Sequence, residues 1–167
     1  MNGNKTDKLL RRIATGDNGA FEELYYLTRK GIYSFLYSYF HNHADTEDGV
    51  QTVYLKIKQN ISQYNRGTNG SAWMLQIAKN YALTCLKRRK ASEVYDELTV
   101  PVTDTYSGGV IETMSRVLTE DEQRIMALHI VWGYKHREIA VMLDCPTGTV
   151  TSKYKRALKK MQDALKE

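Results

Sequence analysis

Apolar residues recur at steps of three and four along most of the chain, which is the period of an amphipathic α-helix. The scarcity of proline, with two residues in 167, also suits a helical chain. The pattern predicts seven helices, which cover about residues 5–14, 18–39, 45–59, 70–90, 120–132, 135–143 and 148–165.

Local signals mark several of the predicted helix ends. Gly16 suits the left-handed position after a helix, and Asp17 suits the N-cap of the next one. Thr119 and Glu122 have the spacing of a capping box. Thr147 is predicted to cap the last helix.

The helical period is lost over residues 93–115, where a proline and two adjacent glycines occur. Loops of about 15 to 20 residues are uncommon inside one compact domain. We therefore expect an all-α fold of two small helical domains, residues 1–92 and 116–167, joined by a flexible linker over residues 93–115, within which a helix can begin near Val110.

The last two predicted helices have the form of a helix-turn-helix. Asp144, Cys145 and Pro146 make a tight turn between them, and Asp144 takes the position that usually requires a left-handed backbone. The final helix has an apolar face and an opposite face rich in cationic and hydroxyl side chains. Such a helix can enter the major groove of DNA.

The charge distribution supports a polyanionic partner. Residues 1–92 carry 14 Lys and Arg against 7 Asp and Glu, and residues 116–167 carry 10 against 7. Residues 93–115 carry five acids and no Lys or Arg. Two basic segments joined by an acidic one indicate nucleic-acid binding, although charge alone leaves ordinary surface charge as an equal alternative.

The sequence indicates neither catalysis nor a bound cofactor. Cys85 and Cys145 lie in different predicted domains, which favours reduced thiols over a disulfide. The histidines and acids of residues 41–48 resemble a metal site, but the helical i, i+4 His pair is absent and a solvated corner is favoured. Neither a transmembrane segment nor a signal peptide is predicted, so we expect a cytoplasmic protein.

Three motifs together resemble the extracytoplasmic-function sigma factors of bacterial RNA polymerase. They are ADTEDGVQTVYLKI at residues 44–57, SAWMLQIAKNYALTCLKRRK at residues 71–90 and GYKHREIAVMLDCPTGTVTSKYKRALKKM at residues 133–161. The third motif is shared by many regulators, whereas all three in this order are specific. The resemblance extends from about Gly16 to Leu165 and implies two helical domains, regions 2 and 4.

The resemblance implies two roles for the first domain. Its third helix would dock on the clamp helices of the polymerase through Asp45, Asp48 and Gln51. The loop at residues 63–71 and the helix after it would bind the opened −10 promoter element through Tyr64, Asn65, Arg66, Lys79, Asn80, Arg88 and Arg89. Tyr64 and Trp73 are candidates for base stacking, although Trp73 shares a face with Ile77 and is favoured as a core residue.

The resemblance assigns the last helix to the −35 element, read as duplex DNA. The residues that match the family pattern or flank it are Thr149, Ser152, Lys153, Lys155, Arg156 and Lys159. Two departures are Thr84, where an acid is frequent, and Thr151, where a cation is frequent. The acidic linker would thread the RNA exit path of the polymerase.

The implied partners are core RNA polymerase, through its clamp helices and flap, promoter DNA and an inhibitory anti-sigma factor. The chain is expected to act as a monomer with no membrane contact of its own. The alternative is a stand-alone helix-turn-helix regulator whose first domain senses a ligand. A ligand sensor gives no reason for the first two motifs, so the sigma-factor interpretation is preferred.

Overall fold

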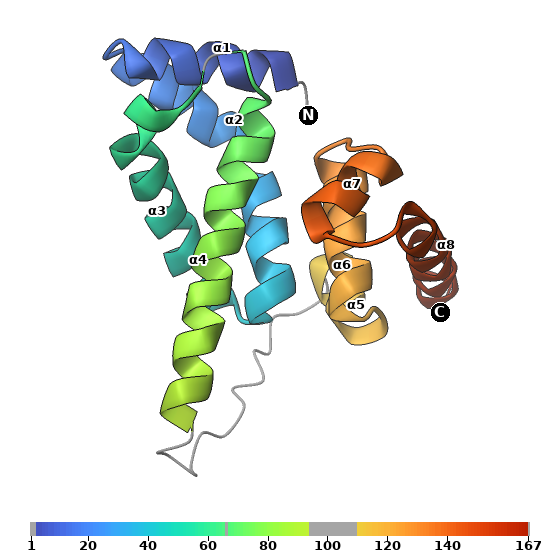
Figure 1. Cartoon of the computed structure of the whole chain (residues 1–167). Coiled ribbons are helices and arrows are strands. Elements are labelled where there is room, and N and C mark those ends of the chain that lie inside the picture. Colours follow the sequence, from blue (N-terminus) through green and yellow to red (C-terminus); the bar gives the residue numbers. More distant parts are fainter. Residues whose placement is uncertain (1–2, 66, 94–109, 167) are drawn as a thin grey trace. The chain divides into compact units, whose positions relative to one another are not determined.

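The computed structural model describes residues 3–65, 67–93 and 110–166, and every regular element in these ranges is helical (Figure 1). The described residues form two compact units, which we call the N-terminal unit, up to Glu93, and the C-terminal unit, from Val110. None of the helices among these residues is long and apolar enough to cross a membrane.

The N-terminal unit consists of four α-helices. They are α1 (Gly3–Ala14), α2 (Asn18–Phe40), α3 (His43–Gln59) and α4 (Gly70–Glu93), with a single 3₁₀ turn, η1 (Ile61–Gln63), after α3. Helices α2, α3 and α4 pack on one another, and α1 lies across one end of α2 and α4 (Figure 1). Their shared core contains Leu24, Phe35, Val50, Ile57 and Met74, all at most 2% exposed.

Side-chain caps start α2 and α3 where the chain turns sharply. Asp17 accepts a hydrogen bond from the Ala20 N–H at 3.0 Å, as predicted for an N-cap. Gly16 has φ +91°, which confirms the predicted left-handed position. Asn42 caps α3 by accepting from the Asp45 N–H at 2.9 Å, so this helix begins at His43, slightly before the predicted start.

The C-terminal unit comprises α5 (Val110–Val117), α6 (Glu120–Met126), a short π-helix η2 (Ala127–Val131), α7 (His136–Leu143) and α8 (Thr147–Ala164). The predicted capping box is confirmed, because Thr119 and Glu122 exchange side-chain and backbone hydrogen bonds. The single helix predicted over residues 120–132 is instead divided between α6 and η2. A π-helix is rare and frequently occurs next to functional residues.

Helix α5 begins inside the interval assigned to the linker. Its residues 110–115 belong to the predicted linker, yet Met114 packs against a cluster that includes Leu118, Ala157 and Met161. Glu93, the first residue of that interval, ends α4. Residues 94–109, with three of the five linker acids, lie outside the described part of the chain.

The helix-turn-helix is formed by α7, Asp144–Pro146 and α8. Asp144 has φ +53°, which confirms its predicted left-handed backbone. The predicted cap is wrong by one residue: Pro146 occupies the N-cap position of α8 and Thr147 is its first helical residue. Proline is already extended there at φ −60°, and its carbonyl oxygen accepts from the N–H groups of Thr149 and Val150.

Candidate functional sites

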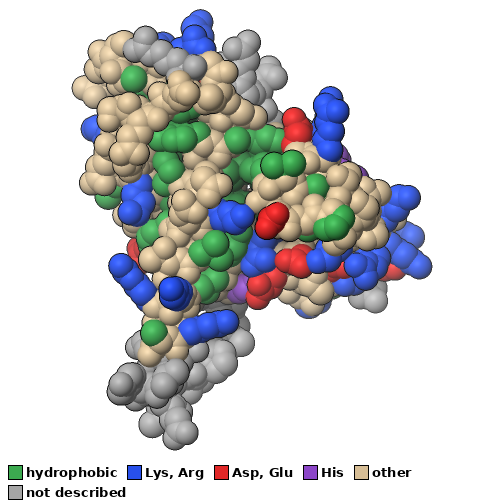
Figure 2. Space-filling view, viewed as in Figure 1, with side chains coloured by type: hydrophobic (Ala, Val, Ile, Leu, Met, Phe, Trp, Pro, Cys, Tyr) green, Lys and Arg blue, Asp and Glu red, His purple; other side chains and the backbone are tan. Residues whose placement is uncertain are grey.

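The outward face of α8 carries four of the six residues predicted to bind the −35 element. Ser152, Lys155, Arg156 and Lys159 are exposed, while Val150 and Ala157 are fully buried on the opposite side of the helix. Figure 2 shows Lys and Arg side chains gathered along the α8 side of the C-terminal unit. This face therefore offers cations and hydroxyl groups to an anionic ligand.

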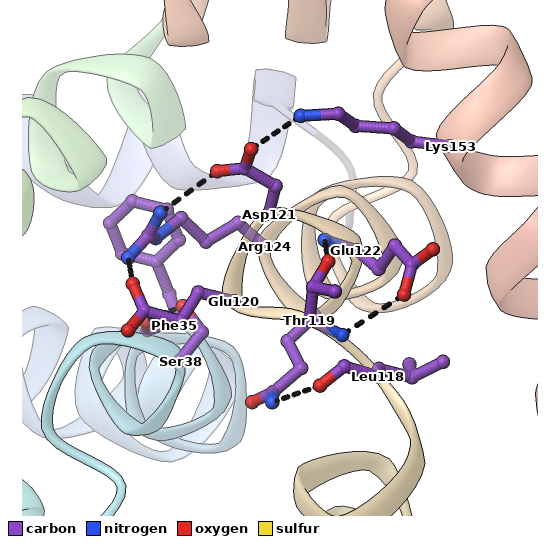
Figure 3. A network of polar contacts seen from close by, with 10 residues as sticks. Phe35, Ser38, Leu118, Thr119, Glu120, Asp121, Glu122, Arg124 and Lys153 are labelled. Carbon is purple, nitrogen blue, oxygen red and sulfur yellow. Dashed lines mark hydrogen bonds and ion pairs between the residues drawn. The ribbon is translucent and has the colours of Figure 1, made fainter.

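The other two predicted residues, Thr149 and Lys153, are only partly exposed and lie on a flank of α8. Lys153 forms an ion pair with Asp121 of α6, and Asp121 also accepts from Arg124 at 3.1 Å (Figure 3). The hydrogen bond from Lys153 is the main reason that the pKa of Asp121 is lowered. In the free chain the Lys153 ammonium group is thus paired with Asp121 of α6, whereas Arg156 is exposed to solvent.

A second cation of α8 is held in the same way. Lys160 donates to Glu122 at 2.7 Å, and the Glu122 side chain is 4% exposed. Burial raises the pKa of Glu122, but the bonds from Lys160 and the Thr119 N–H outweigh it, so the net shift is downward. The capping-box acid of α6 therefore also fixes the orientation of α8.

Asp121 neutralises one of the positive charges of α8 through its ion pair with Lys153. We predict that Asp121→Asn releases Lys153 and adds about one phosphate contact, which steepens the logarithmic salt dependence of duplex binding by about 0.9. Fluorescence anisotropy of the full chain on a −35 duplex between 50 and 200 mM salt measures this slope. In the wild-type background Lys153→Ala should leave the slope unchanged. A slope that is the same in Asp121→Asn and wild type would contradict the release of Lys153.

Three aromatic rings join η2, α7 and α8 beneath the outward face. The ring centroids of His129, His136 and Tyr154 lie 4.7–5.0 Å apart. The His136 ring nitrogen Nδ1 is 3.1 Å from the Thr151 hydroxyl, so Thr151 faces α7 instead of a phosphate. The sequence analysis missed this cluster, because no local pattern joins residues 129, 136 and 154.

The ring cluster is expected to make the C-terminal unit less stable in acid. Burial and the nearby His129 lower the pKa of His136, so its proton is bound less tightly in the folded than in the unfolded chain. The free energy of unfolding is therefore highest above the unfolded pKa of about 6.5 and falls as the pH drops through that value. Thermal unfolding between pH 5.5 and 8 should show this fall in wild type and a flatter profile in His136→Gln. Identical profiles would contradict the prediction.

A stripe of side chains along α4 faces solvent. Gln76, Asn80, Leu83 and Lys87 follow at steps of three and four and are exposed, and Trp73 at the start of the stripe is half-buried. Gln76 donates to the Asn80 side chain at 2.8 Å. Asn80 was predicted to bind the −10 element, whereas Leu83 and Lys87 are new members of this surface, which the helical period of α4 identifies. Arg88 is exposed, and Lys79, nine residues earlier on the other side of α4, is half-buried.

Arg89 points away from this stripe. It follows Asn80 by nine residues, which is two and a half helical turns. Its guanidinium forms an ion pair with Asp45 at 2.8 Å and covers the Phe40 ring. Arg89, predicted to hold DNA phosphates, and Asp45, predicted to bind polymerase, therefore bind each other in the free chain. An exposed ion pair contributes only about 0–1 kcal/mol to stability. DNA at Arg89 or polymerase at Asp45 would therefore have to displace the other residue of the pair, at a small cost in free energy.

Tyr64 does not offer its ring to solvent. It is 7% exposed, packs against Trp73 with ring centroids 5.1 Å apart, and its hydroxyl donates to Asp7 of α1. In the free chain this phenol, buried and bonded to a carboxylate, belongs to the packing of the unit, and its role in base stacking stays a prediction. Asn65 is exposed beside it, and Arg66 lies outside the described residues.

One face of α3 is open to a partner. Asp48 and Gln51, both predicted to bind polymerase, are exposed, and Leu55 lies one turn further on the same side with 59% of its surface exposed. Residues three and four positions apart are neighbours on a helix surface. The face thus combines a carboxylate, an amide and an apolar side chain. The sequence analysis missed Leu55, although its spacing from Gln51 carried the signal.

No group of three or more His, Cys, Asp or Glu side chains in the described ranges is arranged to hold a metal ion. His43 of the predicted corner is hydrogen-bonded to Tyr33 and stacks against it. Glu47 binds Arg29 at 3.2 Å. These side chains act within the packing of α2 and α3.

Comparison with protein families assigns both units. The family described as Sigma-70 region 2 matches residues 24–92, and the family described as Sigma-70, region 4, matches residues 109–161. The ECF RNA polymerase sigma factor SigK of Mycobacterium tuberculosis is 25% identical over 173 residues, which cover 95% of this chain and 92% of the relative. The ECF RNA polymerase sigma-E factor of Escherichia coli is 26% identical over 181 residues, which cover 94% and 93%.

Two solved structures share the fold. One is described as the sigma factor RpoE in complex with the anti-sigma factor NepR from Bartonella quintana, with a TM-score of 0.68, 21% identity and coverage of 87% of this chain and 96% of the other. The second is CnrH in complex with the cytosolic domain of CnrY, with a TM-score of 0.65, 17% identity and coverage of 97% of both chains. At these identities the likeness concerns the fold alone.

Proposed function

We infer that this chain, which belongs to the ECF RNA polymerase sigma factors, directs promoter-specific transcription initiation. The observation that carries this function is the outward face of α8. Ser152, Lys155, Arg156 and Lys159 form one exposed face on the second helix of a helix-turn-helix, in a chain whose first unit matches region 2. The chain has no catalytic part in RNA synthesis and supplies sequence recognition.

We propose that the −35 element is read by α8 as duplex. Arginine is the commonest bidentate partner of guanine in the major groove, and Arg156 is the arginine on this face. Lys155 and Lys159 flank Arg156 at one and three residues, where they reach the DNA backbone. Phosphate contacts of this kind fix the position of the helix, and base contacts supply the specificity.

The N-terminal unit is proposed to hold the opened −10 element. Its surface for the single strand is the α4 stripe, in which Asn80 and Lys87 lie on the same side of the helix as the half-buried Trp73, whose ring would stack on a base. Proteins that bind single strands combine cations that follow the backbone with aromatic side chains that stack on bases. Lys87 replaces Arg89 in this proposal, because Arg89 faces Asp45 on the other side of α4.

Core RNA polymerase is proposed to bind the α3 face of Asp48, Gln51 and Leu55. Aromatic and apolar side chains at the centre of an interface contribute most of its affinity, with polar groups around them. Leu55 supplies such a centre, and Asp48 and Gln51 supply directional hydrogen bonds. We further propose an anti-sigma factor as a regulatory partner, supported by the structural likeness to RpoE, which was solved with the anti-sigma factor NepR.

Reconstituted transcription tests this function. Core polymerase from the source organism is incubated with a supercoiled genomic library, with and without the chain, and the RNA 5′ ends are sequenced. We expect new start sites that share two upstream elements, and we expect their loss with the double variant Lys155→Ala/Arg156→Ala. If wild-type chain creates no new start site, the promoter-recognition function is wrong. Sequence-specific duplex binding without any new start site would point to the helix-turn-helix regulator instead.

A further inference from the structure

Asp7 of α1 connects that helix to the turn that precedes α4. Its carboxylate accepts hydrogen bonds from the Tyr64 hydroxyl and from the Gly67 backbone N–H. It also forms an ion pair with Arg11 at 2.7 Å. The bond from Tyr64 is the main reason that the pKa of Asp7 is lowered, and burial with this bond raises the pKa of Tyr64 to about 12. Asp7 is thus a charged side chain, only 8% exposed, that binds groups both in α1 and in the turn before α4.

Further hydrogen bonds hold the turn before α4. The Tyr64 hydroxyl lies 3.1 Å from the Thr68 carbonyl oxygen, and the Thr68 hydroxyl donates to the Asn65 carbonyl oxygen at 2.7 Å. Gly67 has φ +87°, a backbone conformation that other residues rarely adopt. Asn69 accepts from the Ala72 N–H at 3.2 Å at the start of α4. These hydrogen bonds add to the packing of Tyr64 on Trp73 in fixing the described residues of this turn.

The start of α4 is seated directly on α1. A Cβ atom added to Gly70 would lie 2.8 Å from the Leu10 side chain and 3.1 Å from the Asp7 backbone nitrogen, so a larger residue there would require both neighbours to shift. Next to it the Ser71 hydroxyl donates to the Thr6 hydroxyl at 3.2 Å, and both residues are at most 2% exposed. Helix α1 thus contacts both ends of the segment from Tyr64 to Ser71.

We infer that Asp7 is a positioning residue for promoter opening: through Tyr64 and Gly67 it holds the turn before α4 in the shape that receives the separated −10 strand. This inference rests on the proposed function of the N-terminal unit. The exposed side chains of the turn, Asn65 and Asn69, are presented to solvent by a backbone that Asp7 fixes. A turn ordered in advance loses less entropy when it captures a flexible strand.

The bonds at Asp7 are charge-assisted, which makes them stronger than bonds between neutral groups. Asp7→Asn removes the charge but keeps the size of the side chain, and Tyr64→Phe removes only the hydroxyl. Each variant lowers the fraction of chains with the turn in its ordered shape, and the apparent affinity for the strand falls in proportion to that fraction. We expect promoter opening to fall about tenfold in each single variant. The double variant should fall little further, because both changes break the same bond.

The test uses the full chain with core polymerase at the strongest start site that the wild-type chain creates on the genomic library. Permanganate reactivity of unpaired −10 thymines measures promoter opening. Fluorescence anisotropy measures the affinity of α8 for the −35 duplex, and fluorescence titration measures the affinity for core polymerase. The matched control is Asp17→Ala, which removes the N-cap of α2 in the same unit without contacting the turn. Thermal unfolding of every variant gives the folded fraction.

The inference is supported if promoter opening falls in Asp7→Asn and Tyr64→Phe while −35 binding and polymerase binding stay unchanged. Asp17→Ala should open the promoter normally. Opening equal to wild type in both variants overturns it. A fall that is fully explained by a lower folded fraction of each variant also overturns it and makes Asp7 a stabilising residue alone. Absence of any start site with the wild-type chain is a different result, because it removes the proposed function itself.

Discussion

Arg156→Ala is expected to weaken binding of the full chain to its −35 duplex by about 1–3 kcal/mol, a loss of about 5- to 150-fold. The reason is geometric: Arg156 is exposed on the outward face of α8, between Ser152 and Lys159 along the helix. From this position a planar guanidinium would reach two acceptors on one guanine edge, as we propose for the −35 element. Anisotropy on the wild-type promoter duplex and on single-base variants of it measures both affinity and specificity.

Arg156→Lys provides the control for charge. It keeps the cation but lacks the bidentate fork, so it should retain the salt dependence of binding while losing discrimination at one base pair. Lys155→Ala should weaken binding about equally on all sequences and lower the salt slope by about 0.9. If Arg156→Lys discriminates between bases as well as wild type, Arg156 contacts phosphate only and another residue reads the sequence.

Leu55→Asp is expected to remove most of the affinity for core polymerase, by at least about 2 kcal/mol or roughly 30-fold. Leu55 is the apolar side chain on the open face of α3, and a carboxylate there must be desolvated without a partner when the interface forms. Fluorescence titration of labelled chain with core polymerase measures the loss. Thermal unfolding should be nearly unchanged, because Leu55 makes little contribution to the core.

Leu83→Asp is the matched control, because Leu83 is also an exposed leucine of the N-terminal unit, at 47%, but belongs to the α4 stripe. It should bind core polymerase like wild type and fail in promoter opening, since its new charge repels the DNA strand. The two variants thus separate the two surfaces of one unit. Equal loss of polymerase binding in both would mean that α3 and α4 contribute to one continuous polymerase interface.

The helices and several of their ends were predictable because short-range interactions determine them. The helical period, the N-cap at Asp17 and the capping box of Thr119 and Glu122 depend on groups within four residues of one another. The left-handed backbone at Asp144 was also a local inference. The division of one predicted helix into α6 and η2 was not, because the residue pattern of both segments continues the same helical period.

The direction of charged side chains could not be read from the sequence. Lys153 and Arg156 lie three positions apart in one motif, yet the first pairs with Asp121 and the second is exposed. Arg88 and Arg89 are adjacent, and only Arg89 reaches Asp45. In each case the outcome depends on an acid that a different helix brings within reach, and no local pattern contains that information.

The sequence by itself determined the family, the all-helical fold and the helices that carry the binding faces, because periodicity and motif spacing are properties of neighbouring residues. Only the tertiary structure decided which predicted residues are available to a partner. It buried Tyr64 against Asp7, paired Arg89 with Asp45 and added Leu55 to the α3 face. The physical reason is that burial and ion pairing join residues from distant segments, so they arise only when the helices have packed.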